Sequence, residues 1–167
     1  VALGRDTRLV PIVDGSEKSL LVANVCLVPS DPSTHALQSC CLARELCREL
    51  GQGRILAGQL HLEPGSPAHQ LLRDGYLDND MIEELQRRKD VPLPGKENAA
   101  LVNLLWKAFQ HPSSSLRSCY ATVKGSEIQG CPSMAWFSSD SLQVLGVLDP
   151  VTPSSSSLIK ATLVLSN

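Results

Sequence analysis

The chain has 167 residues, of which 43% are hydrophobic and 19% are charged, and its formal net charge is −2. This composition excludes a chain that is disordered throughout, and the length suits one domain with a buried core. Lys and Arg are not in excess, which argues against a general nucleic-acid-binding surface but leaves a local basic patch open.

The longest uncharged stretches, at 20–30 and 129–139, are too short or too polar to cross a bilayer, which needs about 20 apolar residues. We therefore expect no membrane partner. The first residues lack the order of a secretory signal, and the chain begins with Val instead of Met. We expect a single domain over residues 1–167 that was cut from a larger intracellular protein.

Six cysteines could in principle form three disulfides, but their density is low for a disulfide scaffold. Three of them lie in one predicted helix, and two of those three are adjacent in the sequence, which disfavours a simple bridge. We expect reduced thiols, as in a cytoplasmic or nuclear protein. The six are Cys26, Cys40, Cys41, Cys47, Cys119 and Cys131.

The first third of the chain predicts two strands and a helix. Strands at 9–13 and 20–27 are separated by Asp14-Gly15-Ser16, a turn sequence typical of a hairpin. Asp31 before Pro32 predicts the start of a helix, with an N-cap carboxylate followed by proline at the first helical position. This helix carries one apolar stripe, formed by Ala36, Cys40, Ala43, Cys47 and Leu50.

The middle of the chain predicts one strand, at 54–62, followed by three helices. Leu60 and Leu62 are expected to face the core. A short helix at 67–73 is capped by Ser66, and a second helix at 78–89 has acidic residues at its start and basic residues at its end. A third helix is predicted at 97–110 after a Pro-rich crossing.

The last third predicts strands at 117–123, 134–137, 142–148 and 158–165, joined by turn-forming residues. Together these elements predict an α+β fold. We expect a single domain with an antiparallel or mixed β-sheet, three to four helices packed on it, and a β-meander at the C-terminal end.

No spacing in the sequence supports a metal ion or another cofactor. Structural zinc sites use close pairs of Cys or His, which the six Cys and four His do not form. His61-Leu62-Glu63 matches the His-x-Glu of zinc deaminases, yet the Pro-Cys-x-x-Cys that such enzymes require is absent. We predict no metal ligand and no cofactor.

No catalytic motif is present either, so no catalytic residue is assigned. The Gly-x-Ser-x-Gly sequence of serine hydrolases is missing. A Cys/His enzyme stays open, because Cys119 or Cys131 could meet His61, His69 or His111 in space.

Five residues are candidates for contact with another protein. Trp136 and Phe137 are adjacent in a predicted strand, so their side chains face opposite sides of the sheet. If helices cover only one face, one of the two is exposed; if both faces are covered, both are core residues. The other candidates are Tyr76, Arg87 and Arg88, the last two at the basic end of a helix.

By elimination, the sequence predicts a non-catalytic protein–protein interaction or scaffold domain of a larger intracellular multi-subunit protein. One alternative is a small Cys/His-dependent hydrolase or transferase. A further alternative is a β-rich nucleic-acid-binding module that uses Arg117, Lys124 and Trp136. No resemblance to a known family is specific enough to name.

Overall fold

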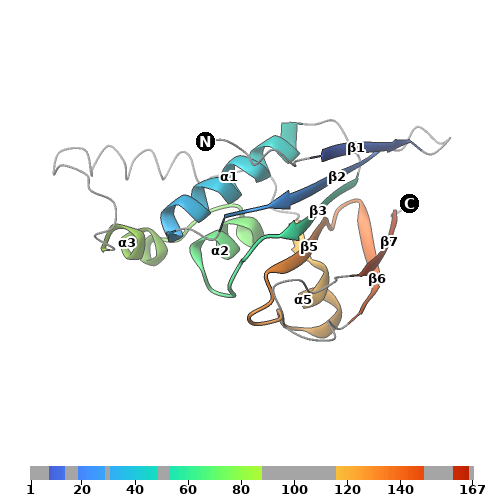
Figure 1. The fold of residues 1–167 in the computed structure, drawn as a ribbon. Helices are drawn as coiled ribbons and strands as arrows, with labels where there is room; N and C mark the ends of the chain where they lie inside the picture. The colour runs from blue at the N-terminus through green and yellow to red at the C-terminus, as the bar shows by residue number, and fades with distance from the viewer. Residues whose placement is uncertain are drawn as a thin grey trace.

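The computed structural model describes residues 8–13, 19–28, 31–48, 53–87, 116–148 and 160–165 (Figure 1). The predicted helix at 97–110 and Arg88 lie outside these residues. The strands are β1 (Arg8–Val13), β2 (Ser19–Cys26), β3 (Gly53–Gln59), β4 (Leu116–Ser118), β5 (Ser133–Ser138), β6 (Leu142–Val147) and β7 (Ala161–Leu165). The helices are α1 (Pro32–Arg48), α2 (Pro67–Asp74), α3 (Asn79–Arg87) and α5 (Cys119–Lys124).

The fold is α+β, as the sequence predicts. Five strands form a mixed sheet in the order β1-β2-β3-β5-β4, in which only β2 and β3 run parallel. Strands β6 and β7 pair antiparallel in a second sheet. The C-terminal strands therefore pair with their neighbours in sequence, β4 with β5 and β6 with β7, but they are divided between two sheets.

The helices begin where the sequence offers a capping side chain. Asp31 Oδ1 accepts the backbone N–H of Thr34 at 3.0 Å, and Asp78 Oδ1 accepts that of Met81 at 2.9 Å. The hydroxyl of Thr34, followed by its backbone N–H, holds the pKa of Asp31 below its usual value, and the N–H of Met81 does the same for Asp78. Ser66 caps α2 in the same way by accepting the N–H of His69.

One local prediction is wrong: the strand expected at 117–123 ends at Ser118. Ser118 is the N-cap of α5 and accepts the N–H of Ala121, and Gly125 ends the helix with φ 81°. The β-branched residues in this segment favour a strand, but the Ser cap and the C-terminal glycine favour a short helix of 6 residues.

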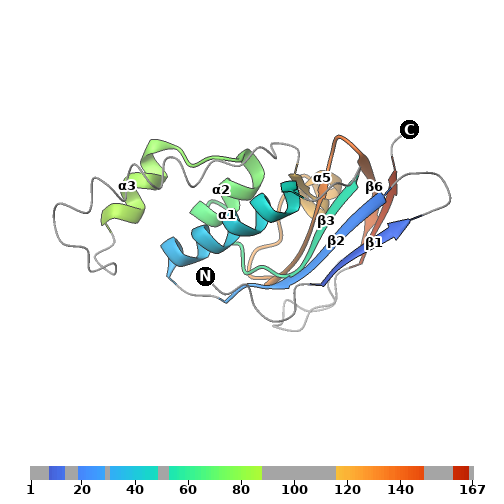
Figure 2. The same cartoon turned by 90° about the horizontal axis from the view of Figure 1, so that it is seen from above.

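Other elements pack on both faces of the five-stranded sheet (Figure 2). Helices α1 and α2 pack on one face, where the core includes Leu42, Leu46, Leu56, Leu72 and Trp136. The β6–β7 sheet packs on the other face, around Leu142, Val144 and Phe137. Helix α3 packs separately, against α1 and α2, through Ile82 and Leu85.

The parallel pair β2–β3 is joined by α1 in a β-α-β unit. Gly58 of β3 lies opposite Val25 of β2, and its φ of 130° is one that side-chain-bearing residues rarely adopt. A Cβ at this position would overlap the carbonyl oxygen of Val25. The close approach of the two strands near their carboxyl ends therefore requires glycine.

Replacing Gly58 with Ala is expected to lower the free energy of unfolding by about 3 kcal/mol, because it adds both backbone strain and a clash with β2. Gly146→Ala is the matched control, since a Cβ there meets no atom within 4 Å. Urea unfolding of both variants measures the difference. Equal stability of the two variants would contradict the close β2–β3 approach.

Candidate functional site

A surface pocket of about 410 Å³ lies at the carboxyl end of β3. Its wall is formed by the segment that leaves β3, by the first turns of α1 and α2, and by one residue of α3. The lining residues are Pro32, His35, His61, Glu63, Pro64, Gly65, Ser66, Pro67, Ala68 and Glu84. Ligands of α/β proteins commonly bind outside the carboxyl ends of parallel strands, so this is the candidate site.

The backbone of His61 has an unusual conformation. Its φ is 50°, and it is the one non-glycine residue with positive φ among those the structure describes. Such conformations in side-chain-bearing residues concentrate at functional sites, where the surrounding structure maintains them. The chain therefore turns sharply after Leu60, and this turn places His61 in the pocket wall.

The imidazole of His35 lies behind this turn, on α1. Its Nε2 is 2.8 Å from the carbonyl oxygen of Leu60, and only 8% of the residue is exposed. Because a carbonyl oxygen can only accept, Nε2 carries the proton. Burial is the main reason that the pKa of His35 lies below its ordinary value, and His61 adds to the effect while Glu63 and the Leu60 carbonyl oppose it. His35 is therefore a neutral imidazole at pH 7.

A second cluster of polar side chains, Ser118, Glu127 and His69, is buried between α2 and α5. Ser118 Oγ donates to Glu127 Oε2 at 2.8 Å, and His69 Nε2 lies 3.3 Å from Glu127 Oε1. In a nucleophilic triad the hydroxyl bonds to the imidazole, whereas here the carboxylate lies between them. The cluster therefore joins three segments of the fold and does not activate Ser118.

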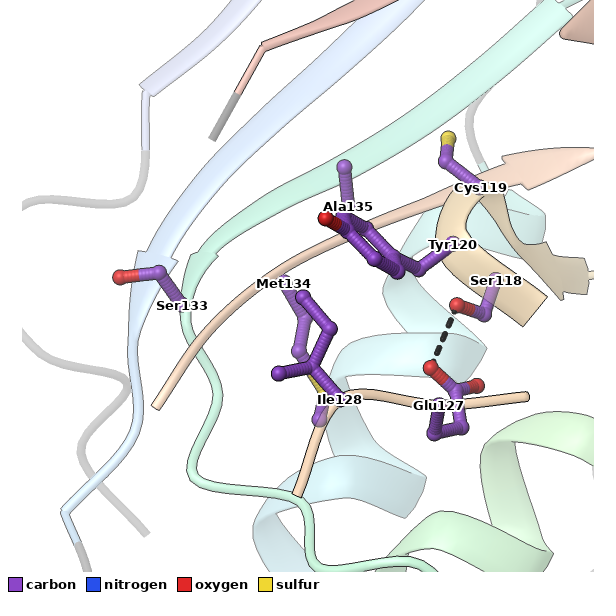
Figure 3. A pocket seen from close by; sticks show the side chains of 8 residues that line it. All are labelled: Ser118, Cys119, Tyr120, Glu127, Ile128, Ser133, Met134 and Ala135. Carbon is purple, nitrogen blue, oxygen red and sulfur yellow. Dashed lines mark hydrogen bonds between the residues drawn. The ribbon is translucent and has the colours of Figure 1, made fainter. Parts of the chain in front are cut away.

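The cavity beside this cluster has a volume of about 10 Å³, enough for about one water molecule. Figure 3 shows Ser118 and Glu127 facing each other there, while the thiol of Cys119 points away from them. A substrate does not fit in this space. The larger pocket at His61 is therefore the better candidate.

The cysteine nucleophiles that the sequence left open are buried. Burial raises the pKa of the Cys119 thiol to about 12, and the nearby Glu127 carboxylate adds to the effect. Cys131 is buried too, and its Sγ donates to the carbonyl oxygen of Ser133. His69 pairs with Glu127, and His111 lies outside the described residues. None of the six cysteines is in a disulfide, and Cys26 is exposed.

The structure does not gather the predicted contact residues into one surface. Trp136 is fully buried and Phe137 is 3% exposed, so both are core residues, and neither offers a side chain to a partner. Burial also prevents Trp136 from stacking on a nucleic-acid base. Tyr76 is 52% exposed, and Arg87 is exposed and paired with Glu83 at 2.8 Å. Contact through Tyr76 and Arg87 stays a prediction.

Sequence reasoning considered His61 as a partner for a cysteine nucleophile and, with Glu63, as part of a zinc motif, and it did not consider His35 or Glu84 as site residues. A signal for the pocket existed in the order strand, helix, strand, because a parallel β-α-β unit places the residues after its strands at one edge.

Among the described residues, no group of three or more His, Cys, Asp or Glu side chains is arranged to hold a metal ion. No helix in the same residues is long and apolar enough to span a membrane.

No protein-family model matches the sequence, and no curated protein matches it. Among solved structures, the chain is similar to the human Nocturnin catalytic domain, determined with a bound sulfate anion. The TM-score is 0.52 at 14% sequence identity, and the match covers 89% of this chain. It covers 47% of the Nocturnin chain, so this chain spans about half the length of that structure.

This likeness concerns the fold, and it is a likeness to a catalytic domain. The prediction of a non-catalytic interaction or scaffold domain in a multi-subunit complex is therefore wrong, and the finding that overturns it is the similarity to Nocturnin. That prediction relied on the absence of sequence motifs. A site assembled from His35, His61 and Glu63 has no fixed spacing in the sequence, so a motif search does not detect it.

The burial of the thiols predicts a clear order of alkylation. At pH 7.5, Cys26 is expected to react with iodoacetamide first, because its side chain is exposed. Cys40 and Cys119 are expected to react only after denaturant is added, since burial raises their pKa to about 11 and about 12. Mass spectrometry of peptides from timed reactions gives the order. Fast modification of Cys119 in the folded protein would contradict its assignment as a core residue.

The buried neutral His35 predicts that acid destabilises the fold. The unfolded imidazole takes up a proton near pH 6.5, while the folded one resists protonation because its pKa is lower. The stabilising effect is thus complete above pH 6.5 and is lost as the pH falls below that value. His35→Gln is expected to reduce the loss of stability between pH 7.5 and 5, as measured by urea unfolding. An identical pH dependence of stability in the wild-type protein and in His35→Gln would contradict the assignment of His35 as a buried neutral imidazole.

Proposed function

We propose that the chain is part of a hydrolase or transferase domain that acts on an ester of a tetrahedral oxyanion, with His61 as its proton-transfer residue. The observation that carries the proposal is the position of His61, held with positive φ in a pocket at the carboxyl end of β3. The similarity to a catalytic domain supports a catalytic role. The sulfate in that domain's structure suggests the class of substrate.

The electrostatics of the pocket suit an anionic group of limited charge. The N-terminal ends of α1 and α2 both reach the pocket. The Asp31 carboxylate offsets the partial positive charge of the α1 N-terminus, so the N-terminus of α2 is the one that favours an anion. Two carboxylates, Glu63 and Glu84, also line the wall. They repel a dianion more strongly than a monoanion, so a monoanionic diester is the favoured substrate.

His61 is suited to move the proton in such a reaction, because an imidazole can both accept and donate a proton. When water or another hydroxyl attacks the phosphorus or sulfur atom, the new bond forms as the hydroxyl proton passes to His61. The bond to the leaving group breaks, the leaving oxygen takes up a proton from water, and His61 gives its proton back to water, which restores the neutral ring. No thiol takes part, since the candidates Cys119 and Cys131 are buried.

The same proposal places residues 1–167 in one domain of a larger chain in an intracellular compartment. The size of the Nocturnin chain supports a larger domain, because this chain matches only 47% of it. The six cysteines, none of which is in a disulfide, support a reducing compartment. Further residues of the site are then expected from the rest of the domain, so the activity is a property of the full-length protein.

Substituting His61 with Asn tests the proposal, because Asn tolerates positive φ but does not transfer protons near neutral pH. Turnover of bis(p-nitrophenyl) phosphate by the full-length protein is expected to fall about 100-fold or more. Absence of turnover in the wild-type protein, or equal turnover in the variant, would overturn the proposal. Circular dichroism and the unfolding midpoint verify that His61→Asn is folded.

Two adjacent glutamates on α3 provide a matched pair of control variants. Glu84 lines the pocket, whereas Glu83 pairs with Arg87. Glu84→Gln is expected to increase the turnover of the dianionic p-nitrophenyl phosphate relative to that of the monoanionic bis(p-nitrophenyl) phosphate, since it removes a repulsive charge. Glu83→Gln is expected to leave this ratio unchanged. Equal effects of the two substitutions would show that Glu84 does not face the substrate.

A further inference from the structure

Three hydrogen bonds hold the peptide segment that places His61 in the pocket. The backbone N–H groups of Leu60 and His61 both donate to the carbonyl oxygen of Pro132, at 2.8 and 3.0 Å. On the other side, the carbonyl oxygen of Leu60 accepts from Nε2 of His35 at 2.8 Å. The segment between β3 and α2 is thus fixed by α1 and by the residue just before β5.

This arrangement explains how His61 keeps its φ of 50°. Positive φ is unfavourable for a residue with a Cβ, and it persists only where the neighbouring groups determine the backbone on several sides. The two bonds to Pro132 fix the N–H groups of the turn, and the one from His61 holds the N–H edge of the Leu60–His61 peptide plane. The bond from His35 fixes the carbonyl of that plane, which sets the direction in which the chain enters His61.

We infer that His35 is a positioning residue, which orients His61 through the Leu60 carbonyl and thereby sets the direction of the His61 side chain in the pocket. The inference rests on the proposed function, since it assigns a role to His61. It goes beyond that proposal by naming the residue on α1 on which the geometry of the site depends.

The chemistry of His35 suits this role. Its burial keeps the ring neutral, and the Leu60 carbonyl selects the tautomer with the proton on Nε2. The titratable groups that act on it are His61 and Glu63, both from the segment that it holds. An aliphatic side chain of similar size would fill the space but leave the buried carbonyl without a donor. A glutamine amide can replace Nε2 as that donor.

The test compares three variants of the full-length protein by amide hydrogen exchange and by turnover. His35→Leu removes the donor, His35→Gln keeps one, and Leu46→Ala destabilises the same helix from a core position away from the turn. In His35→Leu, exchange at the Leu60 and His61 amides is expected to rise about tenfold or more relative to the Leu56 amide, and kcat to fall about tenfold with little change in KM.

His35→Gln is expected to restore both the exchange rates and kcat, and Leu46→Ala is expected to raise exchange without a selective effect on the turn. If exchange at Leu60 and His61 does not rise selectively in His35→Leu, the positioning role is overturned. A selective rise with unchanged turnover supports the positioning of the turn but contradicts His61 as the proton-transfer residue, so the two failures are distinguishable.

A second comparison covers the case in which His35→Leu does not fold. His35→Asn carries an amide that is too short to reach the Leu60 carbonyl, whereas the amide of His35→Gln reaches it. Faster exchange at the two turn amides in His35→Asn than in His35→Gln supports the inference, and equal exchange overturns it.

Discussion

The carbonyl oxygen of Pro132 accepts two hydrogen bonds, from the N–H groups of Leu60 and His61, and the arrangement of the site depends on them. They end β3 and fix the start of the segment that leads to α2. Pro132 directly precedes β5, so the neighbouring strand in the sheet determines where β3 stops. The pocket wall is thereby attached to the antiparallel part of the sheet, while its other side comes from α1 in the parallel part. A change in the β3–β5 register would therefore move His61.

The sequence predicted the elements well where the signal was local. The caps at Asp31 and Ser66 and the turn between the first two strands depend on neighbouring residues, and the structure has the expected hairpin and helices there. The segment after Ser118 shows the limit of this reasoning. Its β-branched residues favour a strand, yet a serine cap and a glycine at Gly125 produce a short helix, because a satisfied helix end outweighs a weak intrinsic preference.

The position of Trp136 and Phe137 could not be decided from the sequence, because burial depends on which elements cover each face of the sheet. Their strand register places Trp136 opposite Leu56 and Phe137 opposite Ile55. The first pair faces α1 and α2, and the second faces β6 and β7. Alternation along a strand specifies only that the two rings point in opposite directions. The packing of the β6–β7 sheet on the far face belongs to the tertiary structure, which the strand pattern does not specify. This packing makes both aromatics core residues.

Tertiary packing also explains why the pocket could not be predicted from the sequence. His35 and His61 are separated by a helix and a strand, and only the parallel pairing of β2 with β3 brings the turn after β3 to the start of α1. That pairing requires Gly58, where β2 lies too close for a side chain. The glycine that permits the strands to approach and the histidine that holds the turn therefore serve one geometry. Both are ordinary residues in the sequence, and their role becomes visible only when the carboxyl ends of the two strands are placed side by side.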